Sequence, residues 1–331
     1  MEEGREKGTV CVTGGAGFVA SWLIKRLLQH GYSVRTTVRS DPKFKEDINH
    51  LKGLPGAQEK LQIFEADLDI PESFDDAING CVGVFHVAHP IDFEGKISHD
   101  TMIKTSVKGT LGILKSCLKS KTVKRVVYTS SIGAAMFISN NIKDVKEVDE
   151  NMWTEVDIFK NIQVPGMSYA ISKTVTERAA IKFAEEHGLD LVTLLPSMIV
   201  GPFISPNLPI SLSLALSLIF GNEELSKLMR QTNVVHIDDI ASAQIFLLEC
   251  PKAKGRHICS AIDITIHDVA KFIFFKYPEL QLPINLLKEI EEEKPIHVSS
   301  EKLLSLGFKF KYGFEDMYDG AIKCCKEKGF I

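Results

Sequence analysis

The sequence has no excess of one charge, no paired-cysteine motif and no long hydrophobic run, and each absence removes a class of protein. Its 39 Lys and Arg against 43 Asp and Glu give a net charge of −4, which supplies no basic surface for nucleic acid. Seven cysteines are an odd number, and none are spaced as Cys-x-x-Cys. This pattern favours free thiols in a reducing compartment over a disulfide framework.

The distribution of hydrophobic residues does not indicate a membrane-spanning segment. The most apolar run, from Leu208 to Phe220, is too short to cross a bilayer and contains Pro209 and three serines. The first residues are charged and lack the apolar stretch of a signal peptide. We therefore expect a cytoplasmic monomer or homodimer with neither nucleic acid nor membrane as a partner.

Short runs rich in β-branched residues alternate with helical patterns through the first two thirds of the chain. Strands separated by helices predict an α/β fold with a Rossmann-type, doubly wound parallel sheet. The continuous apolar character of the runs fits strands buried on both faces. We expect strands at Thr9–Thr13, Ser33–Val38, Leu61–Glu65, Val82–Val87, Arg125–Thr129 and Leu189–Leu195, and helices that include Ala16–His30 and Thr101–Ser120.

The regular alternation ends near Pro196, where several prolines follow one another closely. We assign residues 1–200 to an NAD(P)-binding Rossmann domain and residues 201–331 mostly to a smaller, mainly helical substrate-binding lobe. Two later runs, Val234–Ile240 and Arg256–Cys259, are expected to return as strands to the main sheet.

A glycine motif joins the first strand to the first helix. Its spacing is Gly14-x-x-Gly17-x-x-Ala20, which suits a tight turn, close approach of the backbone to a pyrophosphate, and packing of helix on strand. Phe18 and Val19 begin the helix, whose amide groups and positive dipole end favour a phosphate. The position between a strand and an amphipathic helix makes a dinucleotide site the preferred interpretation over a plain glycine-rich turn.

The second strand ends at Arg39, where an NAD-selective chain would place Asp or Glu. Arg39 can pair with a 2′-phosphate, so NADP(H) is favoured. If Arg39 only stacks on adenine, NAD(H) remains possible. Asp67 and Leu68 follow the third strand and are expected at the adenine edge, although Asp67 could instead cap a helix.

Tyr169 and Lys173 stand four residues apart at the start of a predicted helix, so their side chains share one face. A phenol has a pKa near 10 and is a poor acid–base group at neutral pH. We expect the lysine ammonium, and the positive nicotinamide ring, to lower the pKa of Tyr169 so that it can exchange a proton with a substrate oxygen.

The fifth strand ends at Ser130 and Ser131, at the carboxyl edge where ligands bind in this architecture. Ser131 is placed to orient the substrate oxygen, while a turn or helix cap is the structural alternative. This location distinguishes the Tyr169 and Lys173 pair from the many such pairs on exposed helices.

Taken together, the motifs resemble the extended short-chain dehydrogenase/reductase family, and within it the plant branch of dihydroflavonol, anthocyanidin and vestitone reductases. The resemblance covers nearly the whole chain. It rests on the segments Val12–Phe18, Thr37–Arg39, Ala66–Leu68, Val84–Ala88, Tyr128–Ser131, Ser168–Lys173, Pro196–Phe203 and Val235–Asp239.

The resemblance implies a catalytic set of Ser131, Tyr169 and Lys173, with Lys173 also holding the nicotinamide ribose. It further implies that two segments contact the cofactor, one at the end of the fourth strand and one facing the nicotinamide carboxamide. These are Val87 with Ala88, and Pro196 to Ile199.

Four residues are candidates for substrate contact. Met136 stands where dihydroflavonol reductases carry asparagine, so dihydroflavonol reduction is doubtful, and His89 replaces the family's usual threonine. Met167 is a candidate for an apolar pocket wall, and Asn233 for a polar contact from the lobe. His86 and His89 lack the further ligands of a metal site, so no metal is expected.

These features predict an NAD(P)-dependent oxidoreductase for a bulky aromatic plant metabolite. It would interconvert a carbonyl or hemiacetal with a carbinol or lactone. Longer strings, such as Ser73–Phe85 and Ala253–Ser260, resemble members of this branch that act on alkaloids. This resemblance makes a benzylisoquinoline alkaloid hemiacetal the first expected substrate and a flavonoid or isoflavonoid ketone the second. A nucleotide-sugar epimerase and a non-catalytic NADP(H) sensor are the alternatives of another class.

Overall fold

A seven-stranded parallel sheet forms the centre of the computed structural model, which describes residues 7–39, 48–90, 97–138, 146–160, 162, 166–291 and 294–331. The strand order is β10-β7-β5-β4-β1-β2-β3, the doubly wound arrangement that the sequence predicts. The strands are β1 (Thr9–Val12), β2 (Ser33–Val38), β3 (Leu61–Glu65), β4 (Gly83–His86), β5 (Arg125–Thr129), β7 (Leu191–Pro196) and β10 (Gly255–Cys259).

The strand order reverses between β1 and β4, which pair with each other in parallel. From β1 the chain builds outward to β2 and β3 on one side, and from β4 to β5, β7 and β10 on the other. A crevice forms at the carboxyl ends of the strands at such a switch point, because the crossover helices leave on opposite faces. The predicted glycine motif lies directly there.

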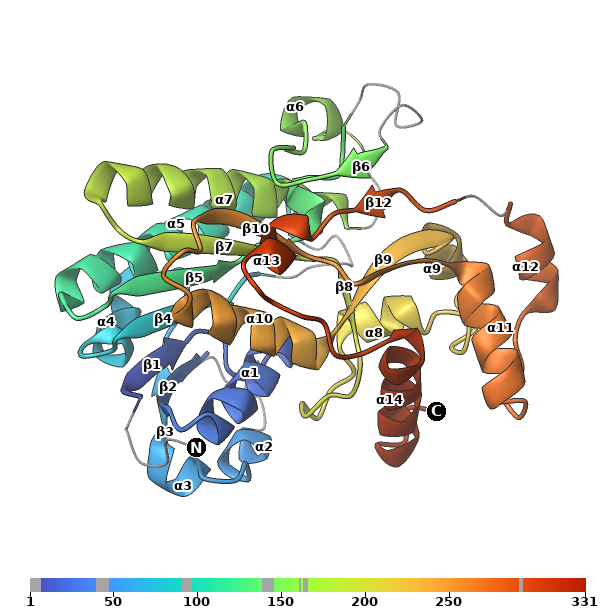
Figure 1. The fold of residues 1–331 in the computed structure, drawn as a ribbon, viewed down its shortest axis with the longest axis horizontal. Coiled ribbons are helices and arrows are strands. Elements are labelled where there is room, and N and C mark those ends of the chain that lie inside the picture. Colours follow the sequence, from blue (N-terminus) through green and yellow to red (C-terminus); the bar gives the residue numbers. More distant parts are fainter. Residues whose placement is uncertain are drawn as a thin grey trace.

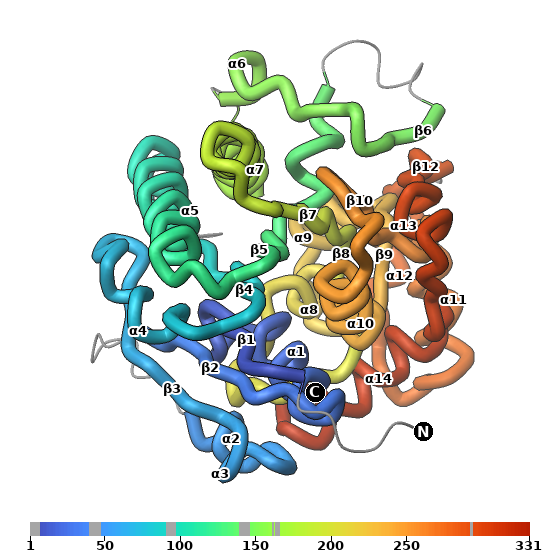
Figure 2. Tube along the Cα trace, turned by 60° about the vertical axis from the view of Figure 1, so that its left-hand side comes forward, coloured from blue at the N-terminus to red at the C-terminus, as the bar shows by residue number. Residues whose placement is uncertain are grey.

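Helices cover both faces of the sheet (Figures 1 and 2). α1 (Phe18–Gln29) packs against α10 (Ile237–Glu249) on one face, and α5 (His99–Ser120) packs against α7 (Met167–His187) on the other. α1 buries Ala20, Leu23, Ile24 and Leu27, at the spacing of one apolar helix face. The strands are apolar on both sides because each side meets such a helix layer.

The C-terminal lobe has its own small sheet and a mainly helical remainder. β8 (Met198–Val200), β9 (Gln231–His236) and β11 (Ile262–Thr265) form a three-stranded sheet in the order β11-β9-β8. The lobe helices are α8 (Ile210–Ala215), α9 (Glu223–Leu228), α11 (Ile266–Lys276), α12 (Ile284–Glu289), α13 (Glu301–Ser305) and α14 (Phe314–Glu327). The helical lobe predicted from the sequence is confirmed.

Short elements complete the described chain. They are α2 (Asn49–Lys52), α3 (Ala57–Lys60), η2 (Pro71–Phe74), α4 (Asp75–Ile78), η3 (Ile132–Ala134), α6 (Val156–Phe159), and the paired strands β6 (Glu147–Val148) and β12 (His297–Val298). Within the parts of the chain described here, no helix is both long and apolar enough to span a bilayer.

One predicted strand is wrong in both extent and partner. The run Val234–Ile240 is split at His236, where β9 ends and α10 begins. The His236 ring accepts a hydrogen bond from the Asp238 amide at 3.1 Å, and the acidic first turn of α10 suits a helix N-terminus. β9 then pairs with β8 and β11 and not with the large sheet, whereas β10 returns to the large sheet beside β7 as expected.

The acidic pair at the start of α10 ties distant segments together. Trp22 donates its indole hydrogen to Asp238 at 2.8 Å, and Asp239 accepts from the amides of Lys311 and Tyr312 at 3.1 and 3.3 Å. Both carboxylates therefore hold the packing of α10 on α1 and on the segment that leads into α14.

Candidate active site

The turn between β1 and α1 has the shape that a pyrophosphate requires. Gly14 has a φ of +74°, and a Cβ there would lie 3.1 Å from the backbone of Ala88, so glycine is needed for both conformation and space. At Gly15 a Cβ would lie 2.2 Å from Thr36 Oγ1. The predicted spacing of Gly14 and Gly17 did not single out Gly15, whose requirement comes from a neighbour on β2.

The N-terminus of α1 opens at the same crevice. Gly17 is its N-cap residue, and no side chain caps the helix, so the amides of Phe18 and Val19 begin it without a side-chain acceptor. The positive end of a helix dipole and free amide donors are what a pyrophosphate binds. The turn and the helix end thus fit a dinucleotide.

The residues predicted for the adenosine side lie directly after β2 and β3. Arg39 directly follows β2 and is exposed. Asp67 Oδ1 accepts from the Asp69 amide at 2.8 Å, so this carboxylate closes a turn and does not cap a helix, and the adjacent Leu68 is partly buried against the core.

Thr13, to which no sequence motif assigns a role, organises the neighbouring loop. The Thr13 hydroxyl accepts from the amides of Val87 and Ala88, both at 3.0 Å, and also bonds His86 Nδ1 at 3.0 Å. With two amides donating to its oxygen, the hydroxyl hydrogen points to His86 Nδ1, and Nε2–H of His86 faces Thr110 Oγ1 at 2.8 Å. Burial lowers the pKa of His86 to about 3, so a neutral ring fixes the predicted cofactor-lining segment.

The end of β5 meets α7 at the catalytic centre. Lys173 is buried and donates to the carbonyl oxygen of Thr129 at 2.7 Å, and its Nζ lies 5.8 Å from the centre of the Tyr169 ring. A hydrogen bond joins the hydroxyls of Tyr169 and Ser131. The structure therefore brings together the three predicted catalytic residues at the carboxyl edge of the sheet.

Ser131 caps a short helix and also contacts the catalytic tyrosine, while its role toward a substrate oxygen stays a prediction. Its hydroxyl oxygen accepts from the Gly133 amide at 3.1 Å and so caps the short helix η3. The same side chain contacts Tyr169. The cap holds the serine oxygen in place beside the phenol.

The pKa of Tyr169 differs from the expectation. Burial raises the pKa of Tyr169 to about 12, and the bond with Ser131 lowers it only in part. Burial also lowers the pKa of Lys173 to about 7, against the upward effect of the Glu177 carboxylate. The structure therefore does not show the lowered pKa of Tyr169 that we expect from Lys173 together with the nicotinamide ring, because desolvation acts on both side chains at once.

Binding of an oxidised dinucleotide should counteract the effect of burial on the pKa of Tyr169. We expect the pKa of Tyr169 to fall when an oxidised dinucleotide binds, because its positive nicotinamide ring favours the phenolate. The measurement is an ultraviolet difference titration of tyrosinate with and without NADP⁺, with Tyr169→Phe as the reference. An unchanged titration on saturation with NADP⁺ would contradict the assigned acid–base role.

The structure places His89 beside the catalytic tyrosine. The two rings meet edge to face with centres 5.5 Å apart, and His89 Nε2 lies 3.3 Å from Ser172 Oγ. Burial is the main cause that lowers the pKa of His89 well below 6.5. A neutral His89 therefore lies beside Tyr169, and its contact with a substrate stays a prediction.

The other three residues predicted to contact substrate differ in their burial and in their hydrogen bonds. Met136 is partly buried against the cluster around Ile132, and Met167 is buried as the first residue of α7. Asn233 donates both amide hydrogens inside the lobe, to Asp263 at 2.7 Å and to the carbonyl of Ile296 at 2.9 Å. The substrate contacts of these residues stay predictions, and the amide donors of Asn233 are already in use.

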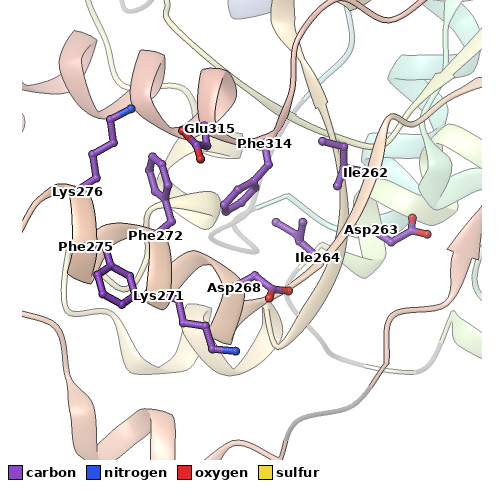
Figure 3. A pocket seen from close by; sticks show the side chains of 10 residues that line it. All are labelled: Ile262, Asp263, Ile264, Asp268, Lys271, Phe272, Phe275, Lys276, Phe314 and Glu315. Atoms are coloured by element: carbon purple, nitrogen blue, oxygen red, sulfur yellow. The ribbon is translucent and has the colours of Figure 1, made fainter.

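A hollow of about 730 Å³ lies elsewhere in the lobe (Figure 3). It is bounded by β11, α11 and the start of α14, and none of the predicted site residues lines it. Among the described residues no group of three or more His, Cys, Asp or Glu side chains is arranged to hold a metal ion.

The fold and the site define a class of protein, an NAD(P)-dependent oxidoreductase with a Rossmann-type dinucleotide domain. The chain belongs to the NAD dependent epimerase/dehydratase family, whose family model matches residues 10–259. This confirms the extended short-chain dehydrogenase/reductase resemblance, and the relatives below confirm its plant branch.

Two relatives and one solved structure show how close this similarity is. The chain is 63% identical over 326 residues to noscapine synthase SDR1 of Papaver somniferum, which covers 97% of this chain and 93% of that protein. It is 48% identical over 332 residues to vestitone reductase of Medicago sativa, with 100% of both chains covered. The crystal structure of vestitone reductase from alfalfa matches with a TM-score of 0.86 at 46% identity, over 98% of this chain and 100% of that chain.

Proposed function

We propose that this enzyme oxidises the hemiacetal of a benzylisoquinoline alkaloid to a lactone. The observation that carries the reaction type is the convergence of Ser131, Tyr169 and Lys173 beside the glycine turn. The substrate class is supported by the 63% identity to noscapine synthase SDR1. An alkaloid of this kind is bulky and aromatic, which suits an apolar wall that includes Met136 and Met167.

The chemistry divides between the bound dinucleotide and three side chains. When bound, the nicotinamide supplies the hydride acceptor for the carbon being oxidised. The Tyr169 phenolate oxygen accepts the hydroxyl proton of the hemiacetal as the carbonyl bond forms, so the substrate loses one hydride and one proton. Ser131 orients the substrate oxygen, and Lys173 favours the phenolate and holds the ribose.

NADP(H) is the proposed nucleotide. Arg39 follows β2 and is exposed at the adenosine side of the crevice, where a guanidinium can pair with a 2′-phosphate. No acidic residue ends β2, whose last residues are Thr37 and Val38. An acidic residue at this position would have favoured the free 2′-hydroxyl of NAD.

A flavonoid or isoflavonoid ketone is the second candidate substrate. The 48% identity to vestitone reductase over the full length of both chains supports it. Met136 weighs against dihydroflavonols, because a thioether cannot donate a hydrogen bond to a phenolic ring oxygen.

A substrate panel tests the proposal. The purified protein is assayed with alkaloid hemiacetals, flavonoid and isoflavonoid ketones and simple carbonyls, each with NAD(H) and NADP(H) separately. We expect the highest kcat/KM for an alkaloid hemiacetal with NADP⁺. A higher kcat/KM for a flavonoid ketone would replace the first candidate by the second, and faster turnover with NAD(H) would refute the role given to Arg39.

A further inference from the structure

A third residue of the catalytic helix contacts the end of β5. Tyr169, Lys173 and Glu177 are spaced by four residues and lie along one face of α7. Ser131 bonds Tyr169 and the Thr129 carbonyl bonds Lys173. The residue between them, Ser130, donates its hydroxyl to Glu177 Oε2 at 2.8 Å.

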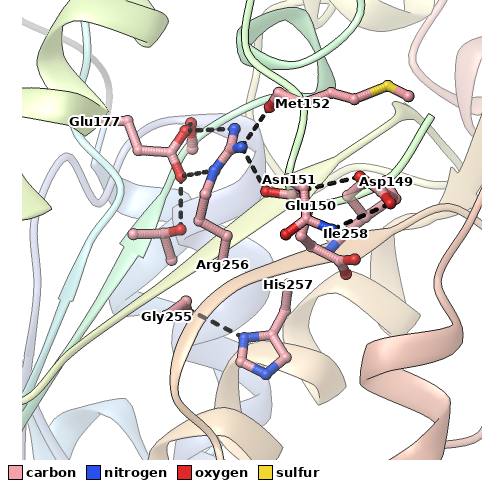
Figure 4. Close-up of polar contacts among 11 residues, drawn as sticks. Asp149, Glu150, Asn151, Met152, Glu177, Gly255, Arg256, His257 and Ile258 are labelled. Atoms are coloured by element: carbon pink, nitrogen blue, oxygen red, sulfur yellow. Dashed lines mark hydrogen bonds and ion pairs between the residues drawn. The ribbon is translucent and has the colours of Figure 1, made fainter.

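The Glu177 carboxylate is fully buried and its two oxygens share four hydrogen bonds (Figure 4). Oε1 accepts from Thr193 Oγ1 at 2.6 Å and from Arg256 Nε at 3.1 Å. Oε2 accepts from Ser130 and from Arg256 Nη2 at 3.2 Å. The carboxylate thereby joins α7 to three neighbouring strands, β5, β7 and β10.

Arg256 carries the connection onward to the segment that follows β6. Its Nη1 donates to the carbonyl oxygens of Glu150 and Met152 at 2.8 and 2.5 Å, and its guanidinium lies 3.6 Å from the centre of the Trp153 ring. Two residues beyond Met152, the Thr154 hydroxyl donates to the Gly133 carbonyl at 2.8 Å. Gly133 belongs to the short helix that Ser131 caps.

We propose that Glu177 and Arg256 are positioning residues that set the catalytic helix against the serine loop. The ion pair holds Ser130, whose two chain neighbours contact Lys173 and Tyr169. An ion pair with a purely structural role would need no further contact. Here the Glu177 carboxylate also accepts a hydrogen bond from Ser130. Ser130 stands between Thr129, which contacts Lys173, and Ser131, which contacts Tyr169.

The pair also affects the charge of Lys173. Burial is the larger effect and lowers the pKa of Lys173 to about 7, while the Glu177 carboxylate raises it. The titratable groups that face Lys173 are Glu177 and Tyr169 from its own helix, Tyr128 from β5, and His86 and His89 from the end of β4. Glu177 is the carboxylate in this set, so its removal shifts Lys173 towards the neutral amine.

The experiment compares Glu177→Gln with the wild type in the substrate panel's best reaction, and it rests on the proposed function for its kinetic readouts. We expect kcat to fall by about 10–100-fold with a smaller change in KM, because geometry at the reacting atoms is disturbed more than binding. The alkaline loss of activity should move to lower pH by about one unit, as the ammonium of Lys173 is lost earlier.

Arg125 provides the matched control. Its buried guanidinium forms an ion pair with the half-buried Asp190 at 2.9 Å and donates to the Leu247 carbonyl at 2.8 Å, but at the start of β5, the other end of the strand. Arg125→Met should lower the melting temperature and leave kcat and the pH profile unchanged. If Glu177→Gln behaves in the same way, its role is merely structural and the proposal is overturned.

Two further measurements can refute the proposal if Glu177→Gln does not fold or if no substrate turns over. If Glu177→Gln does not fold, Thr193→Val and Arg256→Lys replace it, and unchanged kcat and pH profiles in both would overturn the proposal. If no substrate turns over, the proposed function fails, but Lys173 can still be titrated by NMR with isotope-labelled lysine. An unshifted Lys173 titration in Glu177→Gln would then refute the positioning role independently.

Discussion

The Tyr169→Phe variant should lose about 10²–10⁴-fold in kcat, the contribution of a positioned acid–base group. Phenylalanine keeps the buried ring and its edge-to-face contact with His89 but removes the oxygen that exchanges the proton. The Kd for NADP(H) should change by less than about tenfold, because at most one hydrogen bond is lost. Steady-state kinetics and a fluorescence titration of bound NADPH measure the two effects.

Tyr128→Phe is the matched control for this variant. Tyr128 lies on β5 with its ring 5.3 Å from Lys173 Nζ, and its buried hydroxyl has no hydrogen-bond partner among the described residues. We expect its activity to stay close to that of the wild type. Equal activity of both variants would remove Tyr169 from the mechanism.

The Lys173→Met variant should separate activity from stability. We expect kcat/KM to fall by about 10²–10⁴-fold, because the phenolate loses its neighbouring ammonium and general acid–base catalysis is lost. The melting temperature should not fall, because methionine fills the buried space without a polar group to desolvate. The Glu177 carboxylate keeps its partner Arg256 in this variant.

The stability of the wild type should also depend on pH through this one side chain. The pKa of Lys173 falls from its ordinary 10.5 to about 7 in the folded protein, so between these values the unfolded chain binds the extra proton. The contribution of Lys173 to stability therefore rises as the pH increases from about 7 towards 10.5. Buried thiols with raised pKa values, such as Cys11 and Cys259, act in the opposite direction in both proteins. Thermal unfolding at neutral and alkaline pH should therefore show a more positive slope of stability with pH in the wild type than in Lys173→Met; equal slopes would contradict the burial of a titrating amine.

The large sheet and its order of elements could be predicted from the sequence because the buried strands are short, apolar and separated by amphipathic helices. β2, β3 and β5 agree with the predicted bounds at both ends. The run from Val234 could not be divided correctly, because strand and helix are both apolar there and the boundary depends on a hydrogen bond from the Asp238 amide to the His236 ring. The partner of β9 depends on the lobe's tertiary packing, which periodicity does not contain.

The positions of the catalytic residues could be predicted from the sequence, but their ionisation could not. Spacing alone puts Tyr169 and Lys173 on one helix face, and the strand end supplies Ser131. The upward shift in the pKa of Tyr169 comes from burial beneath neighbouring elements, which a local pattern cannot show. Glu177 repeats the four-residue spacing and could have been noticed, but Arg256 lies 79 residues away along the chain.

The position of β10 at the edge of the large sheet has a consequence for how the protein is made. β7 gains its outer neighbour only when Gly255–Cys259 has left the ribosome, after most of the lobe's first half has been translated. Until then the nascent chain holds an unpaired strand edge and a Glu177 carboxylate without its guanidinium partner. A fragment that stops near residue 200 should therefore remain incompletely folded, because it lacks both the edge strand and Arg256.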